Sequence, residues 1–268
     1  MLRWLKRILL TLLVLVGLAL GVTYAWSHAI LTAEHPAAPR AIAVSDDPAT
    51  LARGERLAQV YGCYMGCHGK DMEGYVFFED PLFGKGVAPH LTAAVRNYTP
   101  EQFEAIVRQG IRPDGSGIVA MPSASFSTMT DQDLSAIYSF IAAYPEQPGT
   151  DLGDTTLYPL ARLFLVLGEF ELAAEEIKDR PWPAERLDDP LSHGAYLAQN
   201  ACSECHGLDL AGQEGFTPPL VIAKAYDRDT FRKLMATGVG IDESRDLGLM
   251  AGVSERRFSQ MTEEEVDH

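Results

Sequence analysis

The sequence predicts a mostly α-helical chain, with one membrane-spanning helix at its N-terminus and two homologous helical domains after it. Three observations predict this class. The run 8–26 contains no charged residue. A long sequence pattern occurs twice, in the same order both times. Apolar residues follow helical spacing in several segments, and strand signals are sparse.

The composition fits a folded, globular chain and argues against general nucleic-acid binding. The 268 residues are 47% hydrophobic and 22% charged, which is typical of globular proteins. There are 22 basic and 37 acidic residues, a net charge of −15, and this charge repels a phosphate backbone. Residues 147–268 carry −12 of it, either as a solvated acidic surface or as a face that attracts a basic partner.

Residues 1–26 are interpreted as a membrane anchor. Three basic residues precede the uncharged run, which at about 1.5 Å per residue spans roughly 28 Å, close to the thickness of a bilayer core. Basic residues stay on the cytoplasmic side, so we expect the rest of the chain to lie in a bacterial periplasm, anchored in the inner membrane. A cleaved signal peptide is the alternative, although its apolar core is usually shorter. Residues 27–47, with Pro36 and Pro39, are expected to form a tether.

The repeated pattern divides the remainder into two domains, which we place at residues 48–146 and 186–268. Each copy contains Gly-x-x-Leu-Ala-Gln, then a cysteine pair followed by His-Gly and Asp-x-x-Gly, and later Phe-Ser-x-Met-Thr. The first copy begins at Gly54 and the second at Gly194. Matches that keep their order in both halves argue for a duplicated unit.

Each copy is expected to fold as short helices. Thr99, followed by Pro100, is typical of a helix N-cap with proline at the first helical position. After Thr130, acidic residues precede apolar ones at i, i+3, i+4 and i+7 from Leu134. This order predicts a helix whose first turn carries negative charge and whose apolar face is buried.

The interdomain segment, residues 147–185, contains an apolar stretch at 157–172. Arg162 and Glu169 interrupt this stretch, and it is too short and too charged for a second membrane span. We expect it to pack between the two domains or to form part of a partner surface.

The second copy is shorter at its C-terminal end. Six residues follow Thr262, whereas 14 follow Thr130 up to Tyr144 in the first copy. We therefore expect a truncated C-terminal helix in the second domain and a chain that is a fragment or unusually short. We also expect the second domain to be less stable than the first.

The chemistry is concentrated at the cysteine pairs, and the second motif is the regular one, Cys202-Ser-Glu-Cys205-His206. Cys-x-x-Cys-His is the attachment signature of c-type haem: two thiols become thioethers, and the histidine ligates the iron. Positions i, i+3 and i+4 share one helix face, so these groups can meet one flat macrocycle. A second axial ligand must lie downstream, and a thioether sulfur suits the iron.

Met121, which Pro122 follows, is the candidate second ligand in the first domain, and Met250 is the candidate in the second. Met129 and Met261 are rivals. They lie inside the repeated Phe-Ser-x-Met-Thr at the start of a helix, so we interpret them as core or capping residues. The chain is therefore expected to bind two covalently attached haems c.

The first motif departs from the signature because it is one residue longer. It reads Cys63-x-x-x-Cys67-His68, with Tyr64 where the first cysteine usually stands. On a regular helix Cys63 and His68 would lie about 140° apart around the axis. The turn must therefore bulge to direct both thiols at one haem. Attachment through Cys67 alone is the alternative.

Two other uses of the four cysteines are open. In an exported protein they could form two disulfides, with three possible pairings, or a zinc site. Neither use explains why His-Gly follows each cysteine pair, or why a suitable methionine occurs downstream of each. Haem attachment explains both features.

On these residues the chain resembles the class I cytochrome c family, in its two-haem, membrane-anchored form. The resemblance covers about 180 residues. The arrangement of the chain also resembles that of the cytochrome subunits of periplasmic membrane-bound dehydrogenases. Beyond the cysteine motifs it is carried by Met121 with Pro122, and by the helix that ends in Tyr138, Phe140 and Tyr144.

The resemblance implies particular contacts. Gly54 should pack against Tyr138 or Phe140, where the first and last helices of the domain cross. The carbonyl groups of Pro89 and Pro218 should accept hydrogen bonds from the two ligand histidines, which would set the orientation and basicity of each imidazole.

The resemblance also implies an electron relay rather than an enzyme. An iron with histidine and methionine on its two axial positions has no open site for a substrate, but it can exchange single electrons. We expect electrons to pass from a dehydrogenase to an oxidase or a soluble cytochrome, and a docking role for the acidic second half is compatible with this. The alternative is a two-haem peroxidase, and a methionine for each haem counts against it.

Overall fold

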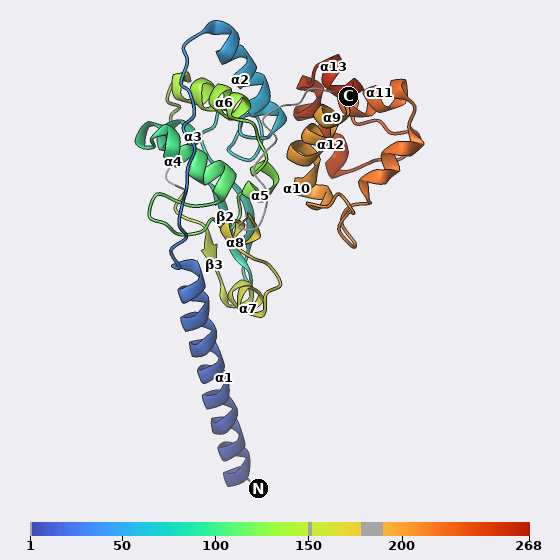
Figure 1. Cartoon of the computed structure of the whole chain (residues 1–268). Helices are drawn as coiled ribbons and strands as arrows, with labels where there is room; N and C mark the ends of the chain where they lie inside the picture. Colours follow the sequence, from blue (N-terminus) through green and yellow to red (C-terminus); the bar gives the residue numbers. More distant parts are fainter. Residues whose placement is uncertain (1, 150–151, 178–189) are drawn as a thin grey trace.

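The computed structural model describes residues 2–149, 152–177 and 190–268 and shows a long helix attached to a mostly helical body (Figure 1). Helix α1 (Leu2–Leu31) stands clear of the body over most of its length. Within the described residues it is the one helix that is long and apolar enough to cross a membrane. The helix continues past the predicted end of the anchor at residue 26.

Residues 48–149, which we call the first region, hold most of the hydrophobic core. The helical elements are α2 (Pro48–Val60), α3 (Leu91–Ala94), η1 (Val95–Asn97), α4 (Pro100–Glu104), the π-helical η2 (Ala105–Gln109), α5 (Ser123–Phe126) and α6 (Asp131–Ala143). Helices α2 and α6 cross closely, because a Cβ on Gly54 would lie 2.0 Å from the carbonyl oxygen of Ala136 and 2.8 Å from Cβ of Phe140. Phe140 is thus confirmed as the partner of Gly54, whereas Tyr138 packs edge-on against Phe103.

Side-chain caps begin helices α2, α4 and α6 of this region. At the start of α2, Oδ2 of Asp47 accepts a hydrogen bond from the backbone N–H of Thr50 at 2.9 Å. The predicted caps are confirmed: Thr99 forms a capping box with Gln102 at α4, and Thr130 caps α6. Each cap satisfies an N–H group that has no partner inside its helix.

A small antiparallel sheet departs from the helical expectation. Strand β1 (Tyr75–Asp80) pairs with β2 (Gly84–Ala88), and β2 pairs with β3 (Thr156–Leu157). The glycines of β2 disfavour strands by propensity, so the sequence carries little signal for strand β2. Here glycine permits close pairing: a Cβ on Gly84 would lie 2.0 Å from the carbonyl oxygen of Thr156.

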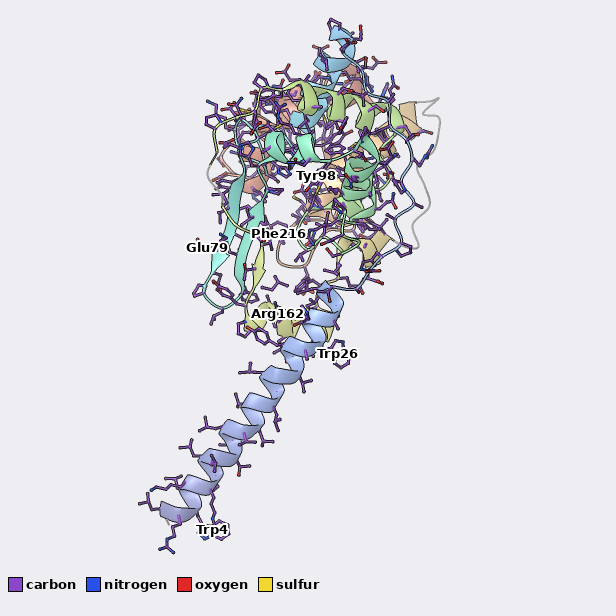
Figure 2. The ribbon with its side chains drawn as sticks, turned by 90° about the vertical axis from the view of Figure 1, so that its left-hand side faces the viewer. Trp4, Trp26, Glu79, Tyr98, Arg162 and Phe216 are labelled. Atoms are coloured by element: carbon purple, nitrogen blue, oxygen red, sulfur yellow. The ribbon has the colours of Figure 1, made fainter. Side chains whose placement is uncertain are left out.

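The apolar stretch after β3 packs on the anchor helix rather than between two domains. Helix α7 (Pro159–Leu167) lies beside the C-terminal end of α1 (Figure 2). Arg162 donates a hydrogen bond to Oγ of Ser27 at 3.0 Å, and its guanidinium lies 4.7 Å from the ring centroid of Tyr24. Arg162, a charged residue that interrupts the apolar stretch, therefore contacts residues of α1. Helix α8 (Ala173–Ile177) follows and packs against α5 and η2.

The sequence predicts a tether at residues 27–47, but residues 27–31 belong to α1. The remaining residues, 32–47, lie against the first region as an extended strap. The backbone N–H groups of Ala43 and Ser45 donate hydrogen bonds of 3.0 Å to the hydroxyl groups of Ser135 and Ser139 on α6. The strap is thus held along the helix that crosses α2.

Residues 190–268, which we call the second region, form a smaller helical group beside α2 and α6 (Figure 1). The elements are α9 (Pro190–Leu197), the π-helical η3 (Ala198–Cys202), α10 (Ser203–His206), η4 (Leu220–Ala225), α11 (Arg228–Thr237), α12 (Leu249–Arg256), η5 (Phe258–Gln260) and α13 (Glu263–Asp267). A Cβ on Gly194 would lie 2.5 Å from the carbonyl oxygen of His268. Helix α13 has 5 residues where α6 has 13. The predicted domain boundary at residue 186 lies outside the described residues.

Polar contacts join the two regions. The guanidinium of Arg56 on α2 donates to both carboxylate oxygens of Glu265 on α13, at 2.6 and 2.9 Å. The hydroxyl of Tyr196 donates to Oδ2 of Asp133 at 2.6 Å. Both contacts are shielded from solvent, because the Glu265 and Asp133 side chains are 10% and 5% exposed.

Candidate functional site

Two histidines are held in the same way, one in each region. Nδ1 of His68 lies 2.9 Å from the carbonyl oxygen of Pro89, and Nδ1 of His206 lies 2.8 Å from that of Pro218. A ring that donates through Nδ1 offers Nε2 as a metal ligand. The two hydrogen bonds that the resemblance implies are therefore confirmed.

The histidine of the first region is the more enclosed. His68 is 8% exposed, and burial lowers its pKa although the hydrogen bond to Pro89 acts in the opposite direction. A lowered pKa keeps the imidazole neutral near pH 7, and the neutral ring is the form that binds a metal. His206 is partly exposed, so its ring meets more solvent.

The first cysteine motif is a turn rather than a helix. Met65 has a left-handed backbone, with φ 56°. The N–H of Cys67 donates to the carbonyl of Gly62 at 2.8 Å, and that of Gly69 donates to Gly66 at 3.1 Å. These bonds close the extra residue into a loop, so the predicted bulge is confirmed. A left-handed conformation costs a non-glycine residue about 1–2 kcal/mol.

The second cysteine motif lies on helical backbone, as its spacing predicts. Cys202 is the last residue of η3, and α10 continues from the next residue to His206. Gly207, with φ 80°, then turns the chain away. Three groups on one face of this helix can therefore approach a single macrocycle.

The backbone after each histidine follows the same path. In both copies the histidine carbonyl accepts a hydrogen bond of 2.8 Å from the glycine of Asp-x-x-Gly. Two residues before that glycine, Met72 and Leu210 are left-handed, with φ 61° and 59°. Their carbonyls accept hydrogen bonds of 2.8 and 2.9 Å from leucine N–H groups. This path brings Pro89 and Pro218 to their histidines.

The four cysteines are free thiols, which contradicts the disulfide alternative. Burial raises the pKa of Cys63 to about 12 and that of Cys202 to about 11, so both are protonated at neutral pH. Among the described residues, no group of three or more His, Cys, Asp or Glu side chains is arranged to hold a metal ion. Paired free thiols beside a histidine fit a covalently bound haem, because the thiols can form the thioether links and the imidazole can bind the iron.

The two methionines predicted as ligands have different backbone settings. Met121 lies in the loop before α5, where its carbonyl accepts a hydrogen bond of 2.8 Å from Ser123. Met250 lies in the first turn of α12. Both are partly buried at the edge of the core, and their ligand roles stay predictions. Met129 is 1% exposed, which confirms its interpretation as a core residue, and Met261 is partly buried against the core.

A charged pair between the two motifs is not predicted from the sequence. Arg257 donates through Nε to the carbonyl of Val60 at 2.9 Å and through Nη1 to Oε2 of Glu204 at 3.0 Å. Glu204 lies inside the second cysteine motif. The repeat carries a signal for it, because Arg257 stands before the repeated Phe-Ser-x-Met-Thr, where the first copy has Ser125.

Comparisons with known proteins find cytochrome c relatives. A family model described as "Cytochrome C oxidase, cbb3-type, subunit III" matches residues 49–141. A relative from Gluconobacter oxydans (strain 621H), "Alcohol dehydrogenase (quinone), cytochrome c subunit", is 33% identical over 215 residues, 73% of this chain and 41% of the relative. The "Fructose dehydrogenase cytochrome subunit" of Gluconobacter japonicus is 29% identical over 170 residues, 59% of this chain and 34% of the relative.

A third relative has a similar name. The "Gluconate 2-dehydrogenase cytochrome c subunit" of Pantoea cypripedii is 26% identical over 178 residues, 61% of this chain and 40% of the relative. The chain thus spans 34–41% of the length of these three relatives. All three names describe the cytochrome subunit of a dehydrogenase.

Proposed function

Because the chain belongs to the cytochrome c family, we propose that it binds two haems and relays single electrons for a membrane-bound dehydrogenase. The matched residues 49–141 contain the first cysteine motif, and a cytochrome c domain binds its haem covalently. The second haem is proposed on the second region. The observation that carries this proposal is the histidine-to-proline hydrogen bond, which occurs beside each cysteine pair with the same backbone path.

In the first region, Cys63 and Cys67 supply the thiols for attachment. Nε2 of His68, whose ring is oriented by the Pro89 carbonyl, and the sulfur of Met121 would be the two protein ligands of the iron of a bound haem. The hydrogen bond at Nδ1 makes the imidazole a stronger donor to the metal.

In the second region, Cys202 and Cys205 would be the attachment thiols, and His206 and Met250 would hold the iron. Haem supplies an iron that takes up and releases one electron. With a histidine and a methionine bound to it, that iron would have no open position for a substrate, so the protein's part would be to hold the site with little rearrangement. This is the arrangement of a carrier and not of a catalyst.

The names of the relatives support a dehydrogenase as the electron donor. We propose an oxidase or a soluble cytochrome as the acceptor. Helix α1 is the proposed anchor in the bacterial inner membrane, with both haem sites on the periplasmic side, since basic residues precede the apolar run. The peroxidase alternative receives no support from these names.

Haem count and axial ligation test the proposal. The full chain, expressed with haem maturation and denatured in pyridine, should contain two haems. The oxidised native protein should show the thioether-to-iron charge-transfer band. Met121→Leu should remove the share of this band that one haem contributes, and the matched control Met129→Leu should keep it. One haem per chain would refute the second site. A high-spin oxidised spectrum with peroxide turnover would favour a peroxidase.

A further inference from the structure

A buried ion pair lies at the junction of the two regions, between the two cysteine motifs. The Arg257 side chain is 9% exposed and that of Glu204 is 23% exposed. Glu204 lies between the two cysteines of the second motif. The carbonyl of Val60, which accepts the Nε hydrogen bond of Arg257, lies three residues before Cys63 of the first motif. One guanidinium is therefore in contact with the protein chain beside both motifs.

The position of the guanidinium is defined on several sides. Gly62 has φ 79°, and a Cβ there would lie 3.1 Å from Cζ of Arg257. The ring of Phe258 lies 5.8 Å from the same carbon. Nη2 of Arg257 is buried and has no hydrogen-bond partner among the described residues. A cation held this firmly away from water acts on its neighbours through a medium that screens it weakly.

The charges of Arg257 and Glu204 change the pKa of cysteine thiols in the two motifs. Burial is the main cause that raises the pKa of the four cysteine thiols. Arg257 opposes this increase at Cys63 in the first motif and at Cys202 in the second. Glu204, which lies inside the second motif, adds to the increase at Cys63 in the first. The ion pair is thus electrostatically close to the attachment points of both proposed haems.

We propose that Arg257 and Glu204 set the reduction potentials of the two haem sites in opposite directions, Arg257 raising them and Glu204 lowering them. The proposal rests on the haem sites proposed above. Reduction brings one electron from an external donor to the iron, and the charge of the site falls by one. A nearby cation favours this change and a nearby anion opposes it. Arg257 and Glu204 therefore act on the two haem sites through their charges, and neither is a ligand of the iron.

The two charges can be separated by a pair of substitutions. Spectroelectrochemical titration of the full chain with both haems bound would compare Arg257→Gln, Glu204→Gln and the double variant with the native protein. We expect Arg257→Gln to reduce the equilibrium constant for reduction roughly tenfold, about 59 mV for one electron. Glu204→Gln should shift the potentials the opposite way, and the double variant should lie between the two.

The signs distinguish this role from a structural one. Both single variants break the same ion pair, so a purely structural role predicts shifts in the same direction, accompanied by similar losses of thermal stability. Arg257→Lys keeps the charge without the forked contacts, and we expect it to restore the potential. Arg256→Gln is the matched control, since it removes the same charge from an exposed neighbour and should leave the potentials unchanged.

Two outcomes would overturn the proposal. One is that both single variants shift the potentials in the same direction, and the other is that Arg257→Gln leaves them at the native values. A failure of the haem assignment is detected separately, because pyridine denaturation counts the haems before any titration. A chain with one haem would refute the second site, yet the opposite signs could still be tested on the haem that remains.

Discussion

The first and second regions share the local geometry of their histidines but differ in what holds the surrounding helices. In the first region, Arg108 donates to Glu104 at 2.9 Å and to Asp131 at 2.6 Å, and the side chains of Arg108 and Glu104 are both 0% exposed. In the second region, the corresponding helix α11 carries Arg232, which pairs with Asp267 and is 38% exposed. A short motif thus suffices for the histidine-to-proline geometry, whereas stability depends on the helices around it.

The largest expected difference between the regions concerns these ion pairs. Arg108→Met should destabilise the first region by about 3–5 kcal/mol, because it leaves the buried carboxylate of Glu104 without its cation. Arg232→Met should have a much smaller effect on the second region, since solvent screens that pair. Hydrogen exchange with mass spectrometry, read separately for the two regions, measures both effects.

A double variant sharpens this test. Glu104→Gln combined with Arg108→Met removes the uncompensated charge, so it should be less destabilised than Arg108→Met alone. Equal losses for the single and double variants would show that packing, and not charge, explains the cost.

The two crossing glycines provide the next contrast. Gly54→Ala should destabilise the first region by about 3 kcal/mol, because the new Cβ meets the backbone of the long helix α6. Gly194→Ala should cost about 1 kcal/mol, because the short helix α13 can shift away. Chemical denaturation followed by region-resolved hydrogen exchange compares them. Equal costs would argue that α13 is held as firmly as α6.

The two cysteine motifs should respond oppositely to a change of one residue. Deleting Met65 removes a left-handed residue and restores the Cys-x-x-Cys-His spacing, so the first haem should remain linked through both cysteines. Inserting Ala between Ser203 and Glu204 should remove one thioether link, because a helical motif has no left-handed position to take up the extra residue and creating one costs about 1–2 kcal/mol. Mass spectrometry of haem-bearing peptides counts the links. Two links in the insertion variant would contradict this explanation.

The smallest expected effect is an acid sensitivity of the junction. Burial acts to raise the pKa of Glu265, but hydrogen bonds from Arg56 and Thr262 lower it below its ordinary value of 4.5. Its contribution to stability is therefore complete above that value and is lost as the pH falls through the lowered pKa. Thermal unfolding between pH 3 and pH 6 measures this loss, and Glu265→Gln should reduce the slope. An unchanged slope would assign the acid sensitivity to other carboxylates.

Local patterns in the sequence predict several local features that the structure contains. The caps at Thr99 and Thr130 and the crossing at Gly54 depend on residues close in sequence or on a family contact, and the structure contains each of them. The bulge in the first motif follows from the count of residues between Cys63 and His68. The two histidine-to-proline hydrogen bonds are confirmed as well.

Contacts between residues far apart in the chain are not predicted by these local patterns. Arg257 and Val60 are 197 residues apart in the chain, and no local spacing indicates their contact. Strand β2 is rich in glycine and so has no propensity signal. The packing of α7 on α1 depends on Arg162 reaching Ser27, 135 residues earlier. In each case the two contacting segments are brought together by the tertiary fold.

The strap and α7 together give α1 two separate connections to the body, and this has a mechanical consequence. A helix joined to a domain by one flexible linker can rotate freely relative to it. A helix that contacts the domain at two points passes its tilt and axial rotation on to the domain. With α1 in a bilayer, the body would present one constant side to other proteins in the same membrane. For the electron relay proposed above, the search for a redox partner would then become lateral diffusion in a plane, with most orientations already excluded.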